Sequence, residues 1–116
     1  QPEDKQIAAV HKLAVLTAAQ LTDTPLGVEK VIVDDGYVGV GYGQPTQGTL
    51  DAINLIARRE GLLFDPVYSG KGLAGMIGLA GQNFFESDKD VIFLHTGGAA
   101  ALFAYGNQLA ENAANG

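Results

Sequence analysis

Short, wholly apolar runs alternate with helix-like stretches along this chain, and this pattern constrains the fold most. Residues 31–33 and 91–94 are uninterrupted apolar runs rich in β-branched side chains, and residues 62–65 form a weaker run that Pro66 must end. Uniformly apolar runs are typical of strands buried on both faces, whereas half-solvated strands alternate apolar and polar residues. We therefore expect an α/β fold in which parallel strands are covered by flanking helices.

The helical spacing of apolar residues predicts four helices, over residues 4–21, 47–60, 70–80 and 99–110. Thr46 is placed to cap the second helix and Gly61 to end it. The tail 112–116 is expected to fray. Three short strands make a narrow sheet with unpaired edges, so we expect the chain to be part of a larger sheet.

Charge and composition narrow the classes of partner. The chain has 116 residues, with 7 Lys and Arg against 13 Asp and Glu, and its net charge is −6. Phosphates would repel such a chain, so neither nucleic acid nor an anionic membrane is expected as a partner. No apolar run has the length of a membrane span, and no signal peptide opens the sequence. There is no cysteine, which excludes thiol catalysis and agrees with a cytoplasmic location.

Two glycine-rich segments suggest nucleotide binding, and both fail on spacing. In residues 36–43 the glycines from Gly39 to Gly43 fall at every second position, which does not match the dinucleotide fingerprint. The segment is expected to be a connection that needs positive φ, and a loop that lets the backbone approach a ligand is the alternative. Residues 69–72 lack the first glycine and the hydroxyl residue of a phosphate loop, and Lys71 is expected to be a solvated lysine.

Few residues of the sequence are candidates for catalysis or for binding a ligand or metal. Residues 96–98 follow a predicted strand and precede a predicted helix, which is where α/β folds bind ligands. Tyr42 and Tyr68 lie in loops that follow predicted strands, and each is either a general acid–base group or an amphipathic packing residue. His95 is expected to be a hydrogen-bonded structural residue and His11 a surface or packing residue, with no partner at metal-ligand spacing. No metal site is predicted.

Three segments resemble a known family when they are taken in order. They are VIVDDGYVG (31–39), GYGQPTQGTLDAINLIARREGLLFDPVYSGKGLAGMIGL (41–79) and VIFLHTGGAAALFAY (91–105). They are similar to the C-terminal part of the pyridoxal-phosphate enzymes that include D-cysteine desulfhydrase and aminocyclopropane-carboxylate deaminase. The resemblance implies a fold of the tryptophan-synthase-β type (fold type II), with the cofactor between two α/β domains.

The resemblance also implies that residues 1–116 are a C-terminal segment of the catalytic fold, incomplete by itself. The Schiff-base lysine, the glycine-rich phosphate cup and the serine near the substrate lie in earlier segments of the family. Lys71 matches a family lysine that does not bind the cofactor. The expected partner is therefore the N-terminal remainder of the same enzyme, on the same or a separate chain. The complete enzyme is expected to be a homodimer, and this chain alone to be inactive.

The resemblance assigns roles to five residues. Tyr42 matches the tyrosine of the GYG motif, which faces substrate and cofactor, and Tyr68 matches a candidate for substrate contact and acid–base work. Thr96, followed by Gly97, matches the threonine that bonds the pyridine nitrogen in the desulfhydrase branch. Ser69 stands beside the cofactor where the deaminase branch has a glutamate. Tyr42 and Tyr68 are thus the predicted catalytic residues, and Thr96, Gly97 and Ser69 the predicted cofactor contacts.

A cofactor ring whose nitrogen is bonded to a neutral hydroxyl is a weaker electron sink than one bonded to a carboxylate. A weaker sink suffices for β-elimination, because the departing sulfur takes up the electron pair, whereas cyclopropane opening needs the stronger sink. The expected activity is therefore that of a pyridoxal-phosphate lyase of the D-cysteine desulfhydrase type, giving pyruvate, ammonia and sulfide. L-cysteate sulfo-lyase and aminocyclopropane-carboxylate deaminase stay open as alternatives. A non-catalytic binding or assembly module is the alternative of another class.

Overall fold

The computed structural model describes residues 2–115, which form two compact units divided between Asp35 and Gly36. Among residues 2–115, no helix combines the length and the apolar character that crossing a bilayer requires.

The first unit contains α1 (Glu3–Ala18) and the short 3₁₀ helix η1 (Val28–Lys30). Two acidic residues occupy the first turn of α1, where they complement the positive end of the helix dipole. The His11 Nε2 atom lies 2.8 Å from the carbonyl oxygen of Leu26, which ties the turn after α1 back to the helix. The predicted packing role of His11 is consistent with this contact.

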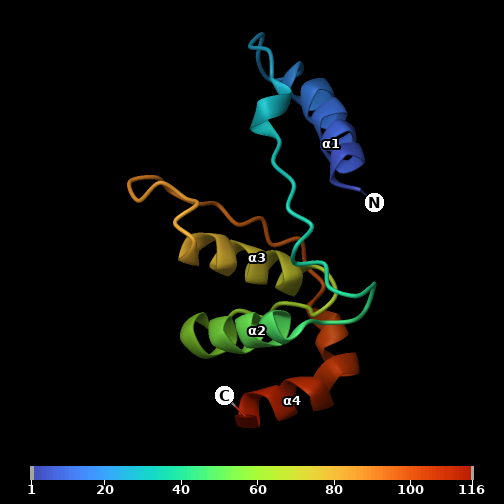
Figure 1. The fold of residues 1–116 in the computed structure, drawn as a ribbon, viewed down its shortest axis with the longest axis vertical. Coiled ribbons are helices and arrows are strands. Elements are labelled where there is room, and N and C mark those ends of the chain that lie inside the picture. The colour runs from blue at the N-terminus through green and yellow to red at the C-terminus, as the bar shows by residue number, and fades with distance from the viewer. Residues whose placement is uncertain (1, 116) are drawn as a thin grey trace. The chain divides into compact units, whose positions relative to one another are not determined.

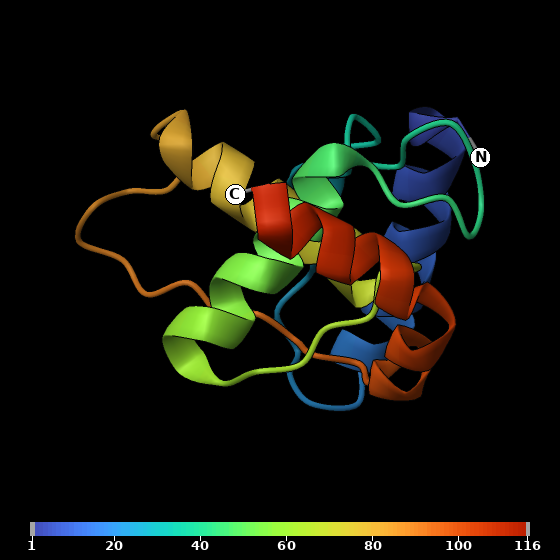
Figure 2. The ribbon, with the colours of Figure 1, turned by 90° about the horizontal axis from the view of Figure 1, so that it is seen from below.

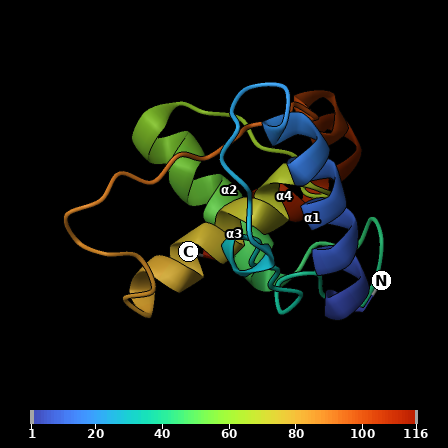
Figure 3. The same cartoon turned by 90° about the horizontal axis from the view of Figure 1, so that it is seen from above.

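The second unit contains α2 (Gln47–Glu60), α3 (Ser69–Gly81), the 3₁₀ helix η2 (Ala99–Tyr105) and α4 (Gly106–Asn115). α2 lies between α3 and α4 (Figure 1). Views from below and from above show that the axes of α2 and α3 cross (Figure 2 and Figure 3). The buried core of this unit consists of Ala52, Ile53, Phe64 and Leu73.

Local signals set the bounds of α2. The Thr46 hydroxyl accepts a hydrogen bond from the Thr49 N–H at 3.1 Å, which satisfies one of the donors that a helix start leaves unpaired. Gly61 ends the helix in the left-handed conformation, with φ of 68°. The predicted helix over 47–60 is confirmed with both of its end signals.

α3 carries glycines at every third position, and two aromatic rings pack on them. A Cβ on Gly75 would lie 3.3 Å from the Tyr37 ring, and a Cβ on Gly78 would overlap the Tyr37 phenol. A Cβ on Gly72 would lie 3.6 Å from the Phe93 ring. The glycines therefore let the segments around these aromatics lie close to α3. The predicted helix over 70–80 is confirmed.

The predicted α/β class is wrong, because residues 2–115 contain no strand. The runs 31–33, 62–65 and 91–94 are extended segments outside any ladder, and Figure 2 shows the last of them as a long loop. Ile92 is 92% exposed and Leu94 80%. A local apolar run becomes a strand only when a neighbouring backbone pairs with its N–H and C=O groups, and the described residues supply no such neighbour.

The C-terminal prediction also needs correction. The sequence predicts one α-helix over residues 99–110, whereas the structure has the 3₁₀ helix η2 followed by the α-helix α4. The tail was expected to fray from 112, yet α4 continues to Asn115. Asn112 explains this, because its side chain is hydrogen-bonded to two residues of α2. Position 116 lies outside the described residues.

Candidate functional site

Tyr42 and Tyr68 lie together in the second unit, although they are 26 residues apart. Their hydroxyl oxygens are 2.7 Å apart, and their ring centroids are 5.7 Å apart in an edge-to-face arrangement. Both side chains reach solvent, with exposed fractions of 79% and 62%. A hydrogen-bonded phenol pair on an open surface can meet a substrate, whereas a buried packing pair cannot. We call these two residues the tyrosine pair.

One phenol of the tyrosine pair donates a hydrogen bond to the other. The hydrogen bond to Tyr42 raises the pKa of Tyr68 above its ordinary 10.0, and desolvation and electrostatic repulsion from an ionised Tyr42 and from the Asp65 carboxylate act in the same direction. Tyr68 is therefore neutral at pH 7. One phenol donates to the other, so the pair keeps one further O–H free for a ligand. At neutral pH the Tyr68 phenol can give a proton and cannot act as a phenolate base.

A buried carboxylate positions Tyr68. Asp65 is 1% exposed and accepts hydrogen bonds from the N–H groups of Val67 at 2.8 Å, Tyr68 at 2.7 Å and Ser69 at 2.8 Å. The Ser69 hydroxyl also donates to Asp65 at 2.5 Å. These bonds fix the turn from which Tyr68 projects and satisfy N–H groups at the start of α3.

The environment of Asp65 has two opposing effects on its ionisation. Burial favours the neutral acid, but the hydrogen bonds from the Ser69 hydroxyl and from the N–H groups of Tyr68, Ser69 and Val67 outweigh it. The pKa of Asp65 is therefore held below its ordinary value of 3.8. At neutral pH the turn is built around a carboxylate.

A curved glycine loop positions Tyr42. Gly39 and Gly43 have φ of 74° and 69°, so the predicted need for positive φ is confirmed at these two positions. The Lys71 ammonium donates to the carbonyl oxygen of Val38 and, at 3.1 Å, to that of Gly41. The Tyr105 hydroxyl donates to the carbonyl oxygen of Gly43 at 2.7 Å. The expectation that Lys71 is simply solvated is therefore wrong.

The segment 95–98 lies against the Asp65 turn. The His95 Nε2–H donates to the Leu63 carbonyl at 2.8 Å, and Nδ1 accepts from the Gly97 N–H at 3.0 Å. These two partners define the tautomer with the proton on Nε2, and the predicted hydrogen-bonded histidine is confirmed. A Cβ on Gly98, whose φ is 97°, would lie 2.6 Å from the Asp65 carboxylate. The close approach requires glycine there.

The predicted cofactor contacts Thr96, Gly97 and Ser69 differ in whether their hydrogen-bonding groups are free to bind a ligand. Thr96 is exposed, and within residues 2–115 its hydroxyl has no hydrogen-bond partner. The Gly97 N–H is bonded to His95, and the Ser69 hydroxyl both donates to Asp65 and accepts from its N–H at 3.0 Å. Contact between a cofactor and either of these two groups would require those bonds to break. No hydrogen bond joins Thr96 to the tyrosine pair in the described part of the chain.

A protein that binds pyridoxal phosphate supplies three groups: a lysine amine, hydrogen-bond donors for the phosphate and a partner for the ring nitrogen. The Thr96 hydroxyl suits the ring nitrogen, because it is exposed and can donate. Lys71 has its ammonium committed to loop carbonyls, so it does not suit the role of the amine. Of the groups considered, the exposed Thr96 hydroxyl is the one that could serve the ring nitrogen.

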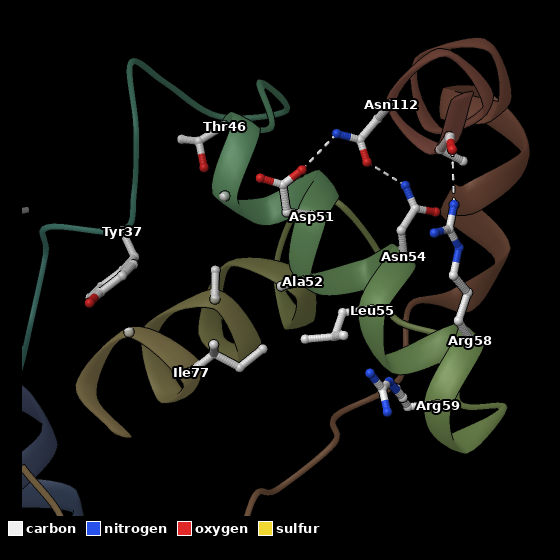
Figure 4. Close-up of a pocket in the computed structure, with 14 residues that line it drawn as sticks. Tyr37, Thr46, Asp51, Ala52, Asn54, Leu55, Arg58, Arg59, Ile77 and Asn112 are labelled. Carbon is white, nitrogen blue, oxygen red and sulfur yellow. Dashed lines mark hydrogen bonds between the residues drawn. The ribbon is translucent and has the colours of Figure 1, made fainter. Parts of the chain in front are cut away.

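A separate cavity of about 750 Å³ lies among α2, α3 and α4 (Figure 4). Its walls include the apolar residues Ala52, Leu55, Ala74 and Ile77, and none of the five predicted site residues lines it. Sequence reasoning missed this cavity, because it depends on how three helices meet.

Polar side chains on one side of α2 border the cavity and hold α4. Asn112 accepts from the Asn54 amide and donates to Asp51 at 2.8 Å, and Arg58 donates to the Ala113 carbonyl at 2.9 Å (Figure 4). We call these contacts the α2–α4 seam. The spacing of Asp51, Asn54 and Arg58 places them on one helix face, and that spacing was the available sequence signal.

No three His, Cys, Asp or Glu side chains within residues 2–115 are grouped so that they could hold a metal ion. Comparison with models of known protein families finds none that matches this chain.

Proposed function

We propose that this chain supplies the substrate-facing tyrosines of a pyridoxal-phosphate lyase that carries out β-elimination on a small sulfur-containing amino acid. The single observation that carries the proposal is the tyrosine pair. Two tyrosines singled out from separate motifs have their hydroxyls 2.7 Å apart and open to solvent. The family resemblance implies that both residues face one substrate, and hydroxyls at this distance can both contact one small molecule.

The reaction is that of the D-cysteine desulfhydrase type, in which D-cysteine and water give pyruvate, ammonia and hydrogen sulfide. Bound pyridoxal phosphate supplies the electron sink that makes loss of the α proton feasible. The part of this chain is proton supply and orientation. In the arrangement in which Tyr42 donates to Tyr68, the Tyr68 phenol gives its proton to the departing sulfur and the Tyr42 proton replaces it through the same bond; solvent then reprotonates the exposed Tyr42 oxygen. Thr96 would donate to the ring nitrogen.

The surroundings of Ser69 favour elimination over cyclopropane opening. The position where the deaminase branch has a glutamate carries a hydroxyl that is bonded to Asp65. The Asp65 carboxylate is buried and accepts from four donors, so it does not replace that glutamate at the cofactor ring. A ring without a carboxylate partner is a weaker electron sink, which suffices for expulsion of sulfide.

The test uses the protein purified with any polypeptide that accompanies it and supplied with pyridoxal phosphate. D-cysteine, L-cysteate and aminocyclopropane carboxylate are offered in separate assays. We expect pyruvate with an equal amount of sulfide from D-cysteine. Sulfite with pyruvate from L-cysteate alone would move the assignment to a sulfo-lyase, and ketobutyrate from the third substrate to a deaminase. Absence of all these products would overturn the proposal.

Two variants connect the activity to the tyrosine pair. Tyr68→Phe removes the proton donor and should lower kcat by about a hundredfold, which is typical of a lost general acid. Tyr37→Phe is the matched control, because it also removes one phenol hydroxyl and the Tyr37 ring packs on α3 away from the pair. The control should keep its activity. Equal activity in Tyr68→Phe and wild type would remove Tyr68 from the proposed role.

A further inference from the structure

Three hydrogen bonds to backbone carbonyls hold the loop that carries Tyr42. Lys71 on α3 donates to Val38 and Gly41, and Tyr105 at the end of η2 donates to Gly43. The accepting carbonyls lie on both sides of Tyr42 in the chain. The loop is thus fixed from two different elements, before and after the residue whose hydroxyl must meet Tyr68.

Around Tyr42 itself the loop has few other contacts beside its bond to Tyr68. The Tyr37 ring packs on α3 at the start of the loop, and the Gln44 N–H donates to the Gly41 carbonyl at 3.4 Å. Two of the loop's glycines have positive φ, and Val40 and Tyr42 are 89% and 79% exposed, so apolar packing contributes little to the conformation of residues 40–43. Glycine also loses more backbone entropy on ordering than other residues do. A charge-assisted bond from an ammonium to a carbonyl is among the stronger bonds available to such a loop.

Lys71 also couples the two halves of the tyrosine pair. It lies three residues after Tyr68, within the first turn of α3, and the Gly72 N–H donates to the Tyr68 carbonyl at 3.2 Å. The same helix start therefore carries Tyr68 and grips the loop of Tyr42.

We infer that Lys71 and Tyr105 are positioning residues, which hold the Tyr42 loop so that the Tyr42 hydroxyl reaches Tyr68. This inference rests on the proposed function for its catalytic consequence, while its structural part stands by itself. It assigns Lys71 a role as a clamp on backbone carbonyls, distinct from that of a cofactor-binding or solvated lysine.

The test compares Lys71→Met, which keeps the length of the side chain and removes its donors, with Lys71→Arg, which restores donors. Nuclear Overhauser contacts between the Tyr42 and Tyr68 rings at neutral pH report the pair directly. We expect the contacts to be lost in Lys71→Met and recovered in Lys71→Arg. kcat/KM should fall about tenfold or more in Lys71→Met, mostly through kcat, because a misplaced group costs rate more than binding.

Lys89→Met is the matched control, because Lys89 is an exposed lysine whose only ion pair in the described chain is with its neighbour Asp88. Tyr105→Phe is the second clamp variant and carries the test if Lys71→Met fails to fold. Ring contacts that persist in both clamp variants would overturn the inference. Lost ring contacts in a protein that shows no lyase activity in any form would leave the clamp standing and overturn the proposed function.

Discussion

Replacement of Asp65 by alanine removes the carboxylate on which the start of α3 is built. The variant loses four hydrogen bonds, three from backbone N–H groups and one from the Ser69 hydroxyl. A hydrogen bond to a charged group contributes about 1.5–3 kcal/mol, but bonds to one acceptor are not additive. Release of a carboxylate from its 1% exposed site offsets part of the loss. We expect the free energy of unfolding to fall by about 2–4 kcal/mol.

Urea unfolding followed by far-ultraviolet circular dichroism measures this loss. With a denaturant slope of about 2 kcal/mol per molar urea, the midpoint should fall by roughly 1–2 M. Asp90→Ala is the matched control, because Asp90 is an exposed acid that makes no side-chain hydrogen bond within residues 2–115. A midpoint shift in Asp65→Ala no larger than in this control would refute the reasoning.

The same variant has a defined pH dependence. Because the pKa of Asp65 is lower in the folded protein than the ordinary 3.8, its ionised form stabilises the fold. That stabilisation is complete above the unfolded-state value and is lost as the pH falls through the lower folded-state pKa. The difference in unfolding free energy between wild type and Asp65→Ala should therefore be constant above about pH 5 and shrink in acid. A difference that grows on acidification would contradict the assignment.

Two further predictions concern packing in the second unit. Gly78→Ala should lower the free energy of unfolding by about 1–3 kcal/mol, because its Cβ would overlap the Tyr37 phenol. Gly81→Ala on the same helix is the control, because a Cβ there meets nothing within 4 Å; in thermal unfolding it should be neutral or stabilising by about 1 kcal/mol. Asn112→Ala should lower the free energy of unfolding by about 1–2 kcal/mol, because two hydrogen bonds to α2 are lost. Urea unfolding measures the loss, with Asn107→Ala as the control. Equal stability of the two variants would show that the α2–α4 seam does not stabilise the protein.

Sequence reasoning succeeded where the signal was local. Thr46 and Gly61 define the ends of α2 through contacts within a few residues of themselves, and the structure has both. The pairing of Tyr42 with Tyr68 was not derivable from local pattern. The family resemblance predicts only that both residues face the substrate, and the bond between their hydroxyls is a finding of the structure.

Sequence reasoning failed where pairing is non-local. The run 91–94 has the composition of a buried strand, yet its residues Ile92 and Leu94 are exposed. Composition reports that a segment prefers an extended backbone and says nothing about which segment will lie beside it. Residues 62–65 approach this run through side chains, with the Phe64 and Phe93 rings 5.3 Å apart, and form no ladder with it.

Lys71 illustrates a second kind of failure. Its two carbonyl partners, on Val38 and Gly41, lie on either side of Gly39, whose positive φ turns the loop, and no spacing rule predicts their convergence. The role of Asp65, in contrast, has a local signal in the sequence. An aspartate followed by proline, with a serine four residues on at the start of a helix, is typical of a side chain that caps backbone N–H groups.

The central claim is that Tyr42 and Tyr68 act as one proton-donating unit on a sulfur-containing substrate. A double-mutant cycle on kcat/KM for D-cysteine, with Tyr42→Phe, Tyr68→Phe and the double variant, tests it most directly. The account predicts that the double variant loses little more than Tyr68→Phe alone. Losses that multiply, as for two independent groups, would contradict it.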